Sequence, residues 1–290
     1  MKTAPKPSEA IGAVNVAVSA DPSDDPALLR TAARLAADLG LPFLERPVDQ
    51  GYEMLLVAAP GSLELRVIAG DAALRGGRAV SVDLEALDTK SGSGRTLRQP
   101  IAKAVGLRGK KESPVTVIDA TAGWGKDTWL LASLGCRVLA VERSAVVATL
   151  LRDGLVRAGA QRPETLERVR LVTADSRHLL RQIAQVEPAA LPNEARAFSK
   201  PDVVYLDPMF AGAERRKTAE KKAMRVLRRL VGSDEDAGEL FAWAMRAAVK
   251  RVVVKRPAKG GLDFGAKPVA THRGKGFCFD VYVPRTTKVK

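Results

Sequence analysis

Acidic side chains stand at four places along the chain where an apolar run ends. Asp119 ends VTVID, Glu142 ends CRVLAVE, Asp175 ends RVRLVTAD, and Asp207 lies in DVVYLDP. Near-continuous apolar runs that alternate with helical stretches predict a parallel sheet covered on both faces. Ligands of such sheets bind at the carboxyl ends of the strands. Capping or turn formation would account for one or two of these acids, whereas all four together predict a shared ligand site.

The first acid opens a glycine-containing turn, DATAGWGKD, which begins at Asp119 and ends at Asp127. Gly123 and Gly125 let the backbone pass close to a ligand without a Cβ in the way. A dinucleotide-binding turn would have a third glycine where this chain has Thr128, and a diphosphate at the helix N-terminus. The two carboxylates would repel that diphosphate. They favour S-adenosylmethionine over NAD, because S-adenosylmethionine carries a sulfonium and an ammonium and no phosphate.

The remaining strand ends fit the same cofactor hypothesis. Glu142, 23 residues after Asp119, is placed to accept hydrogen bonds from both ribose hydroxyls of the cofactor. Asp175 and Ser176 end the third strand, where the adenine edge would lie. Trp124 in the glycine turn either contacts the cofactor or fills space, and the sequence leaves both open.

The fourth strand ends in Asp207-Pro208-Met209-Phe210. Methyltransferases that act on exocyclic amines of nucleobases have an Asp/Asn-Pro-Pro-aromatic element at this place, and here Met is the third residue. The Asp207 carboxylate, helped by the Pro208 carbonyl, would hold the N–H bonds of the amine so that its lone pair faces the methyl group. Phe210 would stack on the flipped base. Such positioning removes up to ~7–11 kcal/mol of a barrier. The alternative is a tight turn after a buried strand.

Composition indicates a globular protein with a polyanion-facing surface. The 290 residues are 46% hydrophobic and 28% charged, which suits one large domain or a large and a small one. The formal net charge is +14, and residues 200–290 alone hold 21 basic and 10 acidic side chains. A charge excess concentrated in one third of the chain favours a nucleic-acid partner over a merely basic, soluble protein.

Much of that charge lies in ERRKTAEKKAMRVLRRL, residues 214–230, directly after the expected base-binding turn. The usual explanation for such a run is a solvated helix face, but its position favours phosphate contacts. Two basic residues at the end of the fifth strand would extend the surface. The residues expected to bind RNA are Arg216, Lys217, Lys221, Lys222, Arg225, Arg228, Lys255 and Arg256.

Three segments are expected along the chain. Strand-like runs and one helix, Pro26–Leu39 closed by Gly40, predict a small N-terminal α/β domain. A basic, Gly/Ser-rich stretch separates it from a larger domain, in which strands and helices alternate and the last two strands surround a basic glycine turn. The expected segments are 1–87 for the small domain, 88–113 for the connection and 114–290 for the larger domain.

Cysteine and histidine usage predicts neither a disulfide framework nor a metal site. Cys136 and Cys278 lie far apart in sequence, and His178 and His272 are isolated. Ile11–Ala20 is similar to a signal-peptide core, but Asn15 interrupts it and valines alternate with small residues as in a strand. We therefore predict a cytoplasmic protein with structural cysteines and histidines.

From about residue 80 the chain resembles the RsmJ-type small-subunit ribosomal RNA guanine-N2 methyltransferases. The resemblance rests on DATAGWGKD, VERSAVVATLLRDGL, VVYLDPMF with the following KKAMRVLRRLVG, KRVVVKRP and GKGFCFDVYV. It implies a Rossmann-like class I methyltransferase sheet, mostly parallel with the last strand antiparallel. The implied reaction is transfer of a methyl group from S-adenosylmethionine to N2 of a guanosine in the near-3′-terminal hairpin of 16S rRNA.

The resemblance also implies which residues contact the cofactor. The family usually has arginine where this chain has Lys126, and lysine keeps the charge but loses the bidentate fork. Methylation of another amine, such as adenine N6 in RNA or DNA, and a non-catalytic rRNA-binding assembly factor are the alternatives. The family's cofactor contacts correspond to Lys126, Asp127, Glu142, Arg143, Asp175, Ser176 and Asp207.

Overall fold

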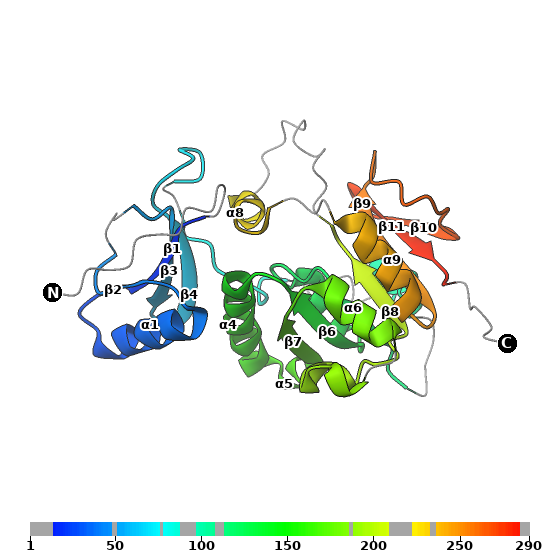
Figure 1. Cartoon of the computed structure of the whole chain (residues 1–290), viewed down its shortest axis with the longest axis horizontal. Helices are drawn as coiled ribbons and strands as arrows, with labels where there is room; N and C mark the ends of the chain where they lie inside the picture. The colour runs from blue at the N-terminus through cyan, green and yellow to red at the C-terminus, as the bar shows by residue number, and fades with distance from the viewer. Residues whose placement is uncertain are drawn as a thin grey trace. The chain divides into compact units, whose positions relative to one another are not determined.

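The structure is a computed structural model that describes residues 14–47, 51–75, 78–87, 97–107, 113–185, 188–208, 222–232 and 236–284 (Figure 1). These residues form two compact units. The first contains the described residues up to Val82 together with 222–232, and the second contains the rest. This division differs from the expected segments, because it follows Val82 and because a helix from the middle of the expected larger domain belongs to the first unit.

The first unit contains a four-stranded sheet of order β2-β1-β3-β4 with one helix packed against it. The helix α1 begins at Pro26, ends at Leu39 and is closed by Gly40 in the left-handed conformation (φ 63°), as predicted. The strand β2 was not predicted because it has only two residues. β1 is parallel to β2 and β3, whereas β4 is antiparallel to β3. The strands are β1 (Val16–Ala20), β2 (Phe43–Leu44), β3 (Met54–Ala59) and β4 (Ser62–Val67).

The helix α8 (Lys222–Val231) joins the first unit through its arginines. Arg229 donates to both carboxylate oxygens of Glu53, at 2.8 and 2.7 Å, and Arg225 donates to Asp71 at 3.2 Å. Val226 and Leu227 are buried. The basic charge of α8 is therefore matched in part by acids that precede it by more than 150 residues in the chain.

The second unit is built on a seven-stranded sheet of order β10-β11-β9-β8-β5-β6-β7. Its strands are β5 (Thr116–Asp119), β6 (Arg137–Glu142), β7 (Val169–Thr173), β8 (Val203–Leu206), β9 (Arg251–Pro257), β10 (Ala270–Arg273) and β11 (Phe277–Tyr282). The first five are parallel, and β11 is antiparallel to both β9 and β10. The predicted sheet, mostly parallel with the last strand antiparallel, is confirmed, because the last strand β11 runs opposite to both of its neighbours.

Helices alternate with these strands. Ser144 caps α4, because its hydroxyl accepts a hydrogen bond from the Val147 N–H. The helices are α2 (Pro100–Ala104), α3 (Lys126–Ser133), α4 (Ala145–Gln161), α5 (Pro163–Leu166), α6 (Ser176–Ala184), the short 3₁₀ turn η1 (Pro188–Ala190), α7 (Asn193–Arg196) and α9 (Ala237–Ala247). None of the described helices is long and apolar enough to cross a bilayer.

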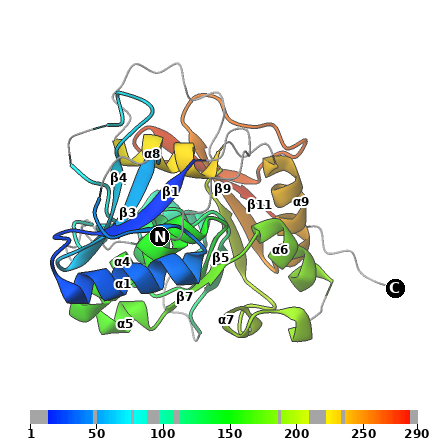
Figure 2. The same ribbon diagram turned by 60° about the vertical axis from the view of Figure 1, so that its left-hand side comes forward.

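One apolar core lies between the sheet and the helices α6 and α9, which lie side by side in both views (Figure 2). Aromatic rings fill its centre: Phe241 stacks on Phe264 at 4.4 Å between ring centroids and meets Tyr282 edge-on at 4.9 Å. Burial of such rings contributes about 1.5–3 kcal/mol per side chain. Cys136 and Cys278 are both buried thiols.

Candidate active site

The glycine turn follows β5, the strand at which the order of strands in the sheet reverses. β5 is in the middle of the parallel strands, with β6 on one side and β8 on the other. The turn is tied to both neighbours, because the Ala120 N–H donates to the Tyr205 carbonyl (3.0 Å) and the Ala122 N–H to the Val141 carbonyl (3.1 Å). In sheets of this kind the reversal point is where ligands bind.

Glycine is favoured at the two positions of this turn for different structural reasons. Gly123 is left-handed (φ 50°), and its N–H donates to Glu142 at 3.0 Å. Gly125 is left-handed (φ 70°), and a Cβ on it would lie 2.2 Å from Leu151 Cδ1. Packing of the turn against α4 therefore requires a glycine at position 125, whether or not a ligand approaches. Trp124 is buried, which agrees with its space-filling alternative.

Glu142 joins the ends of β5 and β6. Its carboxylate accepts hydrogen bonds from the N–H groups of Gly123 (3.0 Å) and Ser144 (2.8 Å), and the residue is 5% exposed. The expected ribose contact stays a prediction, and the structure adds that Glu142 also holds the glycine turn in place.

Asp119 is the most deeply buried acid of the site, at 1% exposure. It accepts hydrogen bonds from the Thr128 hydroxyl (2.5 Å) and the Thr121 N–H (3.3 Å). Burial raises the pKa of Asp119 to about 7, and the nearby Asp127 and Asp207 charges act in the same direction. Asp119 therefore carries only a partial negative charge at neutral pH. The four strand ends together carry less negative charge than the four acids in the sequence suggest.

Asp127 and Asp207 share a cation that the sequence does not place between them. The Lys255 ammonium lies 2.7 Å from Asp127 Oδ2 and 2.9 Å from Asp207 Oδ2. Burial lowers the pKa of Lys255, but the two carboxylates outweigh that effect and hold it above its usual range. The Tyr205 hydroxyl donates to Asp127 at 2.6 Å. Residues from β8, β9 and α3 thus meet in one hydrogen-bonded cluster.

The backbone at Asp207 is fixed by the turn beside it. The Asp207 N–H donates to the Thr121 hydroxyl at 2.6 Å, so the end of β8 is tied to the glycine turn. The Asp207 side chain is 38% exposed, and Pro208 is buried. Met209 and Phe210, which complete the predicted base-binding element, lie outside the described residues.

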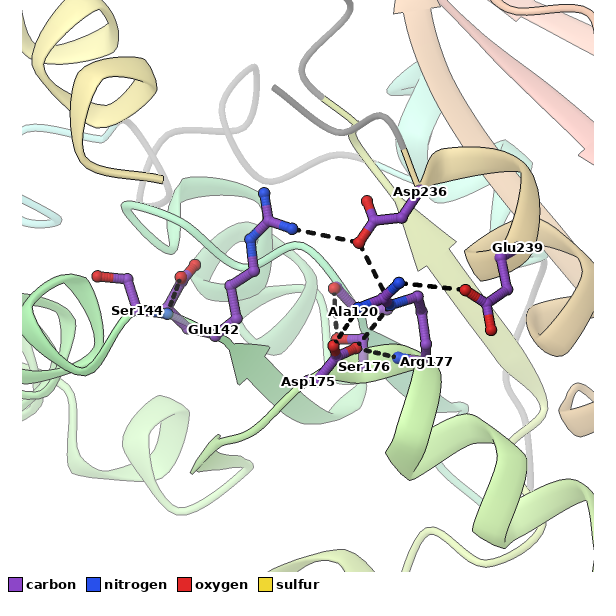
Figure 3. Close-up of polar contacts among 9 residues, drawn as sticks. Ala120, Glu142, Ser144, Asp175, Ser176, Arg177, Asp236 and Glu239 are labelled. Atoms are coloured by element: carbon purple, nitrogen blue, oxygen red, sulfur yellow. Dashed lines mark hydrogen bonds and ion pairs between the residues drawn. The ribbon is translucent and has the colours of Figure 1, made fainter. Parts of the chain in front are cut away.

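Asp175 follows β7, the edge strand of the sheet, and belongs to an ion-pair cluster with Arg177 (Figure 3). Asp175 caps α6 by accepting from the Arg177 N–H (2.9 Å), and its other oxygen lies 2.6 Å from the Arg177 guanidinium. Arg177 also pairs with Asp236 (3.2 Å) and Glu239 (3.1 Å) at α9. The hydrogen bond from Arg177 lowers the pKa of Asp175. The cluster joins α6 to α9, so Asp175 has a structural role that the cofactor hypothesis did not include.

The neighbours of Asp175 are engaged within the protein as well. The Ser176 hydroxyl donates to the Ala120 carbonyl at 2.7 Å, and Arg143 donates to Asp236 at 3.3 Å. Lys126, the first residue of α3, is exposed. The expected cofactor contacts of Ser176, Arg143 and Lys126 stay predictions. A cofactor would compete with the internal hydrogen bonds of Ser176 and Arg143 for the same side chains.

The described residues that are expected to bind RNA belong to both units. Arg216, Lys217 and Lys221 lie outside the described residues. Lys222, whose ammonium donates to the Arg78 carbonyl (3.1 Å), Arg225 and Arg228 are on α8 in the first unit. Lys255 and Arg256 are in the second unit, within β9.

Both β9 residues have internal carboxylate partners. Lys255 belongs to the cluster with Asp127 and Asp207, and the Arg256 guanidinium makes a forked pair with Asp280. The expectation that Lys255 and Arg256 extend a phosphate-binding surface stays a prediction, and the structure adds an internal carboxylate partner to each. The Lys255 ammonium points to the end of β8, where the proposed chemistry lies.

The sequence analysis did not name Tyr205 or Arg177 and gave Lys255 a different role, although each of the three had a weak signal. Tyr205 is a polar ring in an otherwise aliphatic strand, two residues before Asp207 and hence on the same face. Lys255 is a charge within a buried run, which ordinarily requires a partner. Arg177 immediately follows an expected cofactor residue. None of these signals names the partner, because each partner lies on a different element.

The arrangement suits a cationic ligand. Asp119 and Asp127 lie at the two ends of the glycine turn, and Glu142 and Asp207 are hydrogen-bonded to it. Lys255 neutralises one of these four charges, and Asp119 is partly protonated. The net charge of these groups remains negative, which favours a sulfonium or ammonium and disfavours a diphosphate. No group of three His, Cys, Asp or Glu side chains suited to a metal ion occurs in the described part of the chain. Sheet, turn and acids together define an S-adenosylmethionine-dependent methyltransferase.

Comparison with known proteins gives the same class and a particular family. Residues 34–284 match the family described as "Putative SAM-dependent methyltransferase". The ribosomal RNA small subunit methyltransferase J of Chromobacterium violaceum is 41% identical over 273 residues, covering 89% of this chain and 94% of the relative. The protein of that name from Photobacterium profundum is 46% identical over 243 residues, covering 81% and 88%.

A solved structure agrees with these relatives. The crystal structure of a SAM-dependent methyltransferase from Neisseria gonorrhoeae has a TM-score of 0.64 and 32% sequence identity, covering 93% of this chain and 96% of the other. The chain belongs to the ribosomal RNA small subunit methyltransferase J family. It is an enzyme that uses S-adenosylmethionine.

Proposed function

We propose that this protein methylates the exocyclic N2 of a guanosine in the near-3′-terminal hairpin of 16S rRNA. The products are N2-methylguanosine and S-adenosylhomocysteine, and the reaction takes place in the cytoplasm on rRNA or the small ribosomal subunit. The names of the relatives support rRNA of the small subunit as the substrate. The site supports an amine as the acceptor.

The position of Asp207 carries the proposal. An exocyclic amine is a weak nucleophile because its lone pair is delocalised into the ring. A carboxylate that accepts its N–H bonds turns that lone pair toward the methyl donor. Asp207 is suited to this task because its backbone is held by Thr121 while its side chain is 38% exposed. When bound, S-adenosylmethionine supplies the electrophilic methyl group.

The nucleoside profile of rRNA tests the proposal. A strain lacking the gene should lose one N2-methylguanosine from the near-3′-terminal hairpin of 16S rRNA, and the wild-type gene should restore it. Asp207→Ala should fail to restore it at equal protein abundance. An unchanged guanosine profile, or loss of N6-methyladenosine instead, would contradict the proposal. Calorimetry with S-adenosylmethionine separates an enzyme from an assembly factor without a working cofactor site, which should bind none.

The RNA-binding role of α8 makes a quantitative prediction. If Lys222, Arg225 and Arg228 contact phosphates, replacing all three with glutamine should reduce the slope of log Kd against log salt by roughly 0.7–0.9 per contact. Filter binding of the isolated 16S hairpin at several salt concentrations measures the slope. The matched control replaces Arg152, Arg170 and Arg181, which are exposed basic residues of the second unit. A slope equal to the wild-type slope would assign α8 to packing against Glu53 and Asp71 alone.

A further inference from the structure

Lys255 is placed unusually for a lysine in a parallel sheet. β9 reads RVVVKRP, and Lys255 follows three buried valines. Its ammonium lies between two carboxylates from other elements, Asp127 at 2.7 Å and Asp207 at 2.9 Å, and 5.6 Å from the centroid of the Phe277 ring. A partly buried ammonium is costly unless it is paired, so the two carboxylates fix its position.

The cluster is asymmetric around this ammonium. Asp127 receives a second hydrogen bond, from the Tyr205 hydroxyl at 2.6 Å, and both Asp127 and Lys255 are less exposed than Asp207. Burial and the neighbouring Asp127 charge raise the pKa of the Tyr205 phenol, so it remains a donor. Tyr205 and Asp127 therefore support Lys255 from the protein side, and Asp207 is the member that faces solvent.

The protonation of Asp207 decides which nucleobase edge it can hold. An ionised carboxylate only accepts hydrogen bonds, whereas a protonated one also donates. Guanine presents two adjacent donors, N1–H and the N2 amine. Adenine presents the N6 amine beside N1, which is an acceptor and would face the carboxylate lone pairs. A carboxylate that stays ionised thus accepts guanine and disfavours adenine.

We propose that Lys255 is a positioning residue that keeps Asp207 an acceptor-only carboxylate and thereby restricts the enzyme to guanine. The inference rests on the proposed function, since it assigns to Asp207 the amine of the target base. Lys255 acts through Asp207 and does not itself need to touch the base. Its compact ammonium, with donors in more than one direction, can serve both carboxylates at once.

Removal of the ammonium should also shift the pH dependence. Charged and titratable groups of the described residues near Asp207 include Asp119, Asp127, Tyr205 and Lys255. Removal of Lys255 takes a positive charge away from this group of carboxylates, and like charges favour protonation of one of them. The acid limb of the rate profile should therefore move to higher pH.

The test uses two RNA hairpins that differ only at the target base, guanosine or 2-aminopurine. Both present an amine at C2, but 2-aminopurine has an acceptor at N1 where guanine has a donor. One hydrogen bond to a charged group corresponds to a preference of roughly 10- to 150-fold. We expect the wild type to prefer guanosine by that factor in kcat/KM. Lys255→Met should bring the ratio toward one and move the acid limb upward.

Matched variants separate this role from a loss of folding. Lys255→Arg should restore part of the guanosine preference and of the pH profile. Lys250→Met removes a lysine that pairs with Asp202 at the opposite end of β9, and it should leave both unchanged. Asp207→Asn, which is uncharged and of the same shape, should lose the preference even if Lys255→Met does not fold.

The outcomes distinguish the two proposals. A wild-type enzyme that methylates neither hairpin at the amine overturns the proposed function, and the inference with it. A wild type that methylates guanosine, with Lys255→Met or Asp207→Asn keeping the wild-type ratio and pH limb, overturns only the role of Lys255. Affinity for S-adenosylmethionine, measured by calorimetry, should stay within a few-fold of wild type in Lys255→Met.

Discussion

Two acidic clusters at the carboxyl edge of the same sheet use their charges differently. At β5 and β8, Asp127 and Asp207 share the partly buried ammonium of Lys255, and the buried Asp119 lies near both carboxylates. At β7, Asp175 joins two acids of the α9 segment around arginines at the surface. The first cluster keeps excess negative charge in a partly buried place, whereas the second pairs most of its charge where water screens it.

The comparison shows that the number of acids does not identify the reactive ones. Burial shifts the pKa of a carboxyl group toward neutrality, as in Asp119, and groups with such shifts are concentrated at functional sites. A surface network with matched partners holds helices together and contributes little per pair. We therefore expect substitutions in the first cluster to affect the reaction, and those in the second to affect stability.

The largest effect is expected for Asp207→Ala. Loss of the acceptor that positions the amine should reduce kcat by at least about 100-fold. Affinity for S-adenosylmethionine should stay within a few-fold, because the backbone bond to Thr121 remains. Single-turnover methylation of the guanosine hairpin and calorimetry measure the two quantities. Turnover of the variant at the wild-type rate would show that Asp207 has no role in methyl transfer. Both acidic clusters would then have structural roles only.

A smaller effect is expected for Asp119→Asn on the pH dependence of stability. The pKa of Asp119 is raised to about 7 in the folded protein, so the folded state binds the proton more tightly and this residue lowers stability as pH rises from about 4 to 7. Between pH 5 and 7 the loss amounts to about 2 kcal/mol, at 1.36 kcal/mol per pKa unit. The variant should lack that loss in urea unfolding. The exposed Glu194→Gln is the control, with an unchanged profile.

The smallest effect is expected in the second cluster. The pKa of Asp175 is lowered, so its ion pair stabilises the fold at neutral pH and that contribution disappears as pH falls through the folded pKa. Asp175→Ala should cost about 1 kcal/mol of unfolding free energy for the lost helix cap. Asp175→Asn keeps a cap acceptor and should cost less. A large loss of methylation in Asp175→Asn, with stability unchanged, would show that this cluster is functional.

Local sequence patterns predicted much of the second unit. The continuous apolar runs and their terminal acids placed β5 to β8 within two residues of their observed ends. Gly40 marked a helix boundary correctly because a C-terminal cap depends on neighbouring residues only. The glycine turn, the parallel sheet and the charge preference for a cationic cofactor were likewise readable from residues close together in the chain.

Contacts between distant segments could not be predicted in this way. The basic pattern of α8 indicated an RNA-facing helix, but its arginines meet Glu53 and Asp71, and its place in the first unit follows from that packing. A run of positive charge specifies attraction to some anion. Which anion it meets, a phosphate or a carboxylate of the same chain, depends on the path of the backbone between them.

The sequence by itself determined the elements, the turn and the residue types that a methyltransferase needs. Only the tertiary structure decided that Lys255 lies between Asp127 and Asp207, residues 128 and 48 positions earlier in the chain. The physical reason is that hydrogen bonds and ion pairs act over a few ångströms in space. Strand order determines which side chains come within that distance, and strand order is set by packing of the whole sheet.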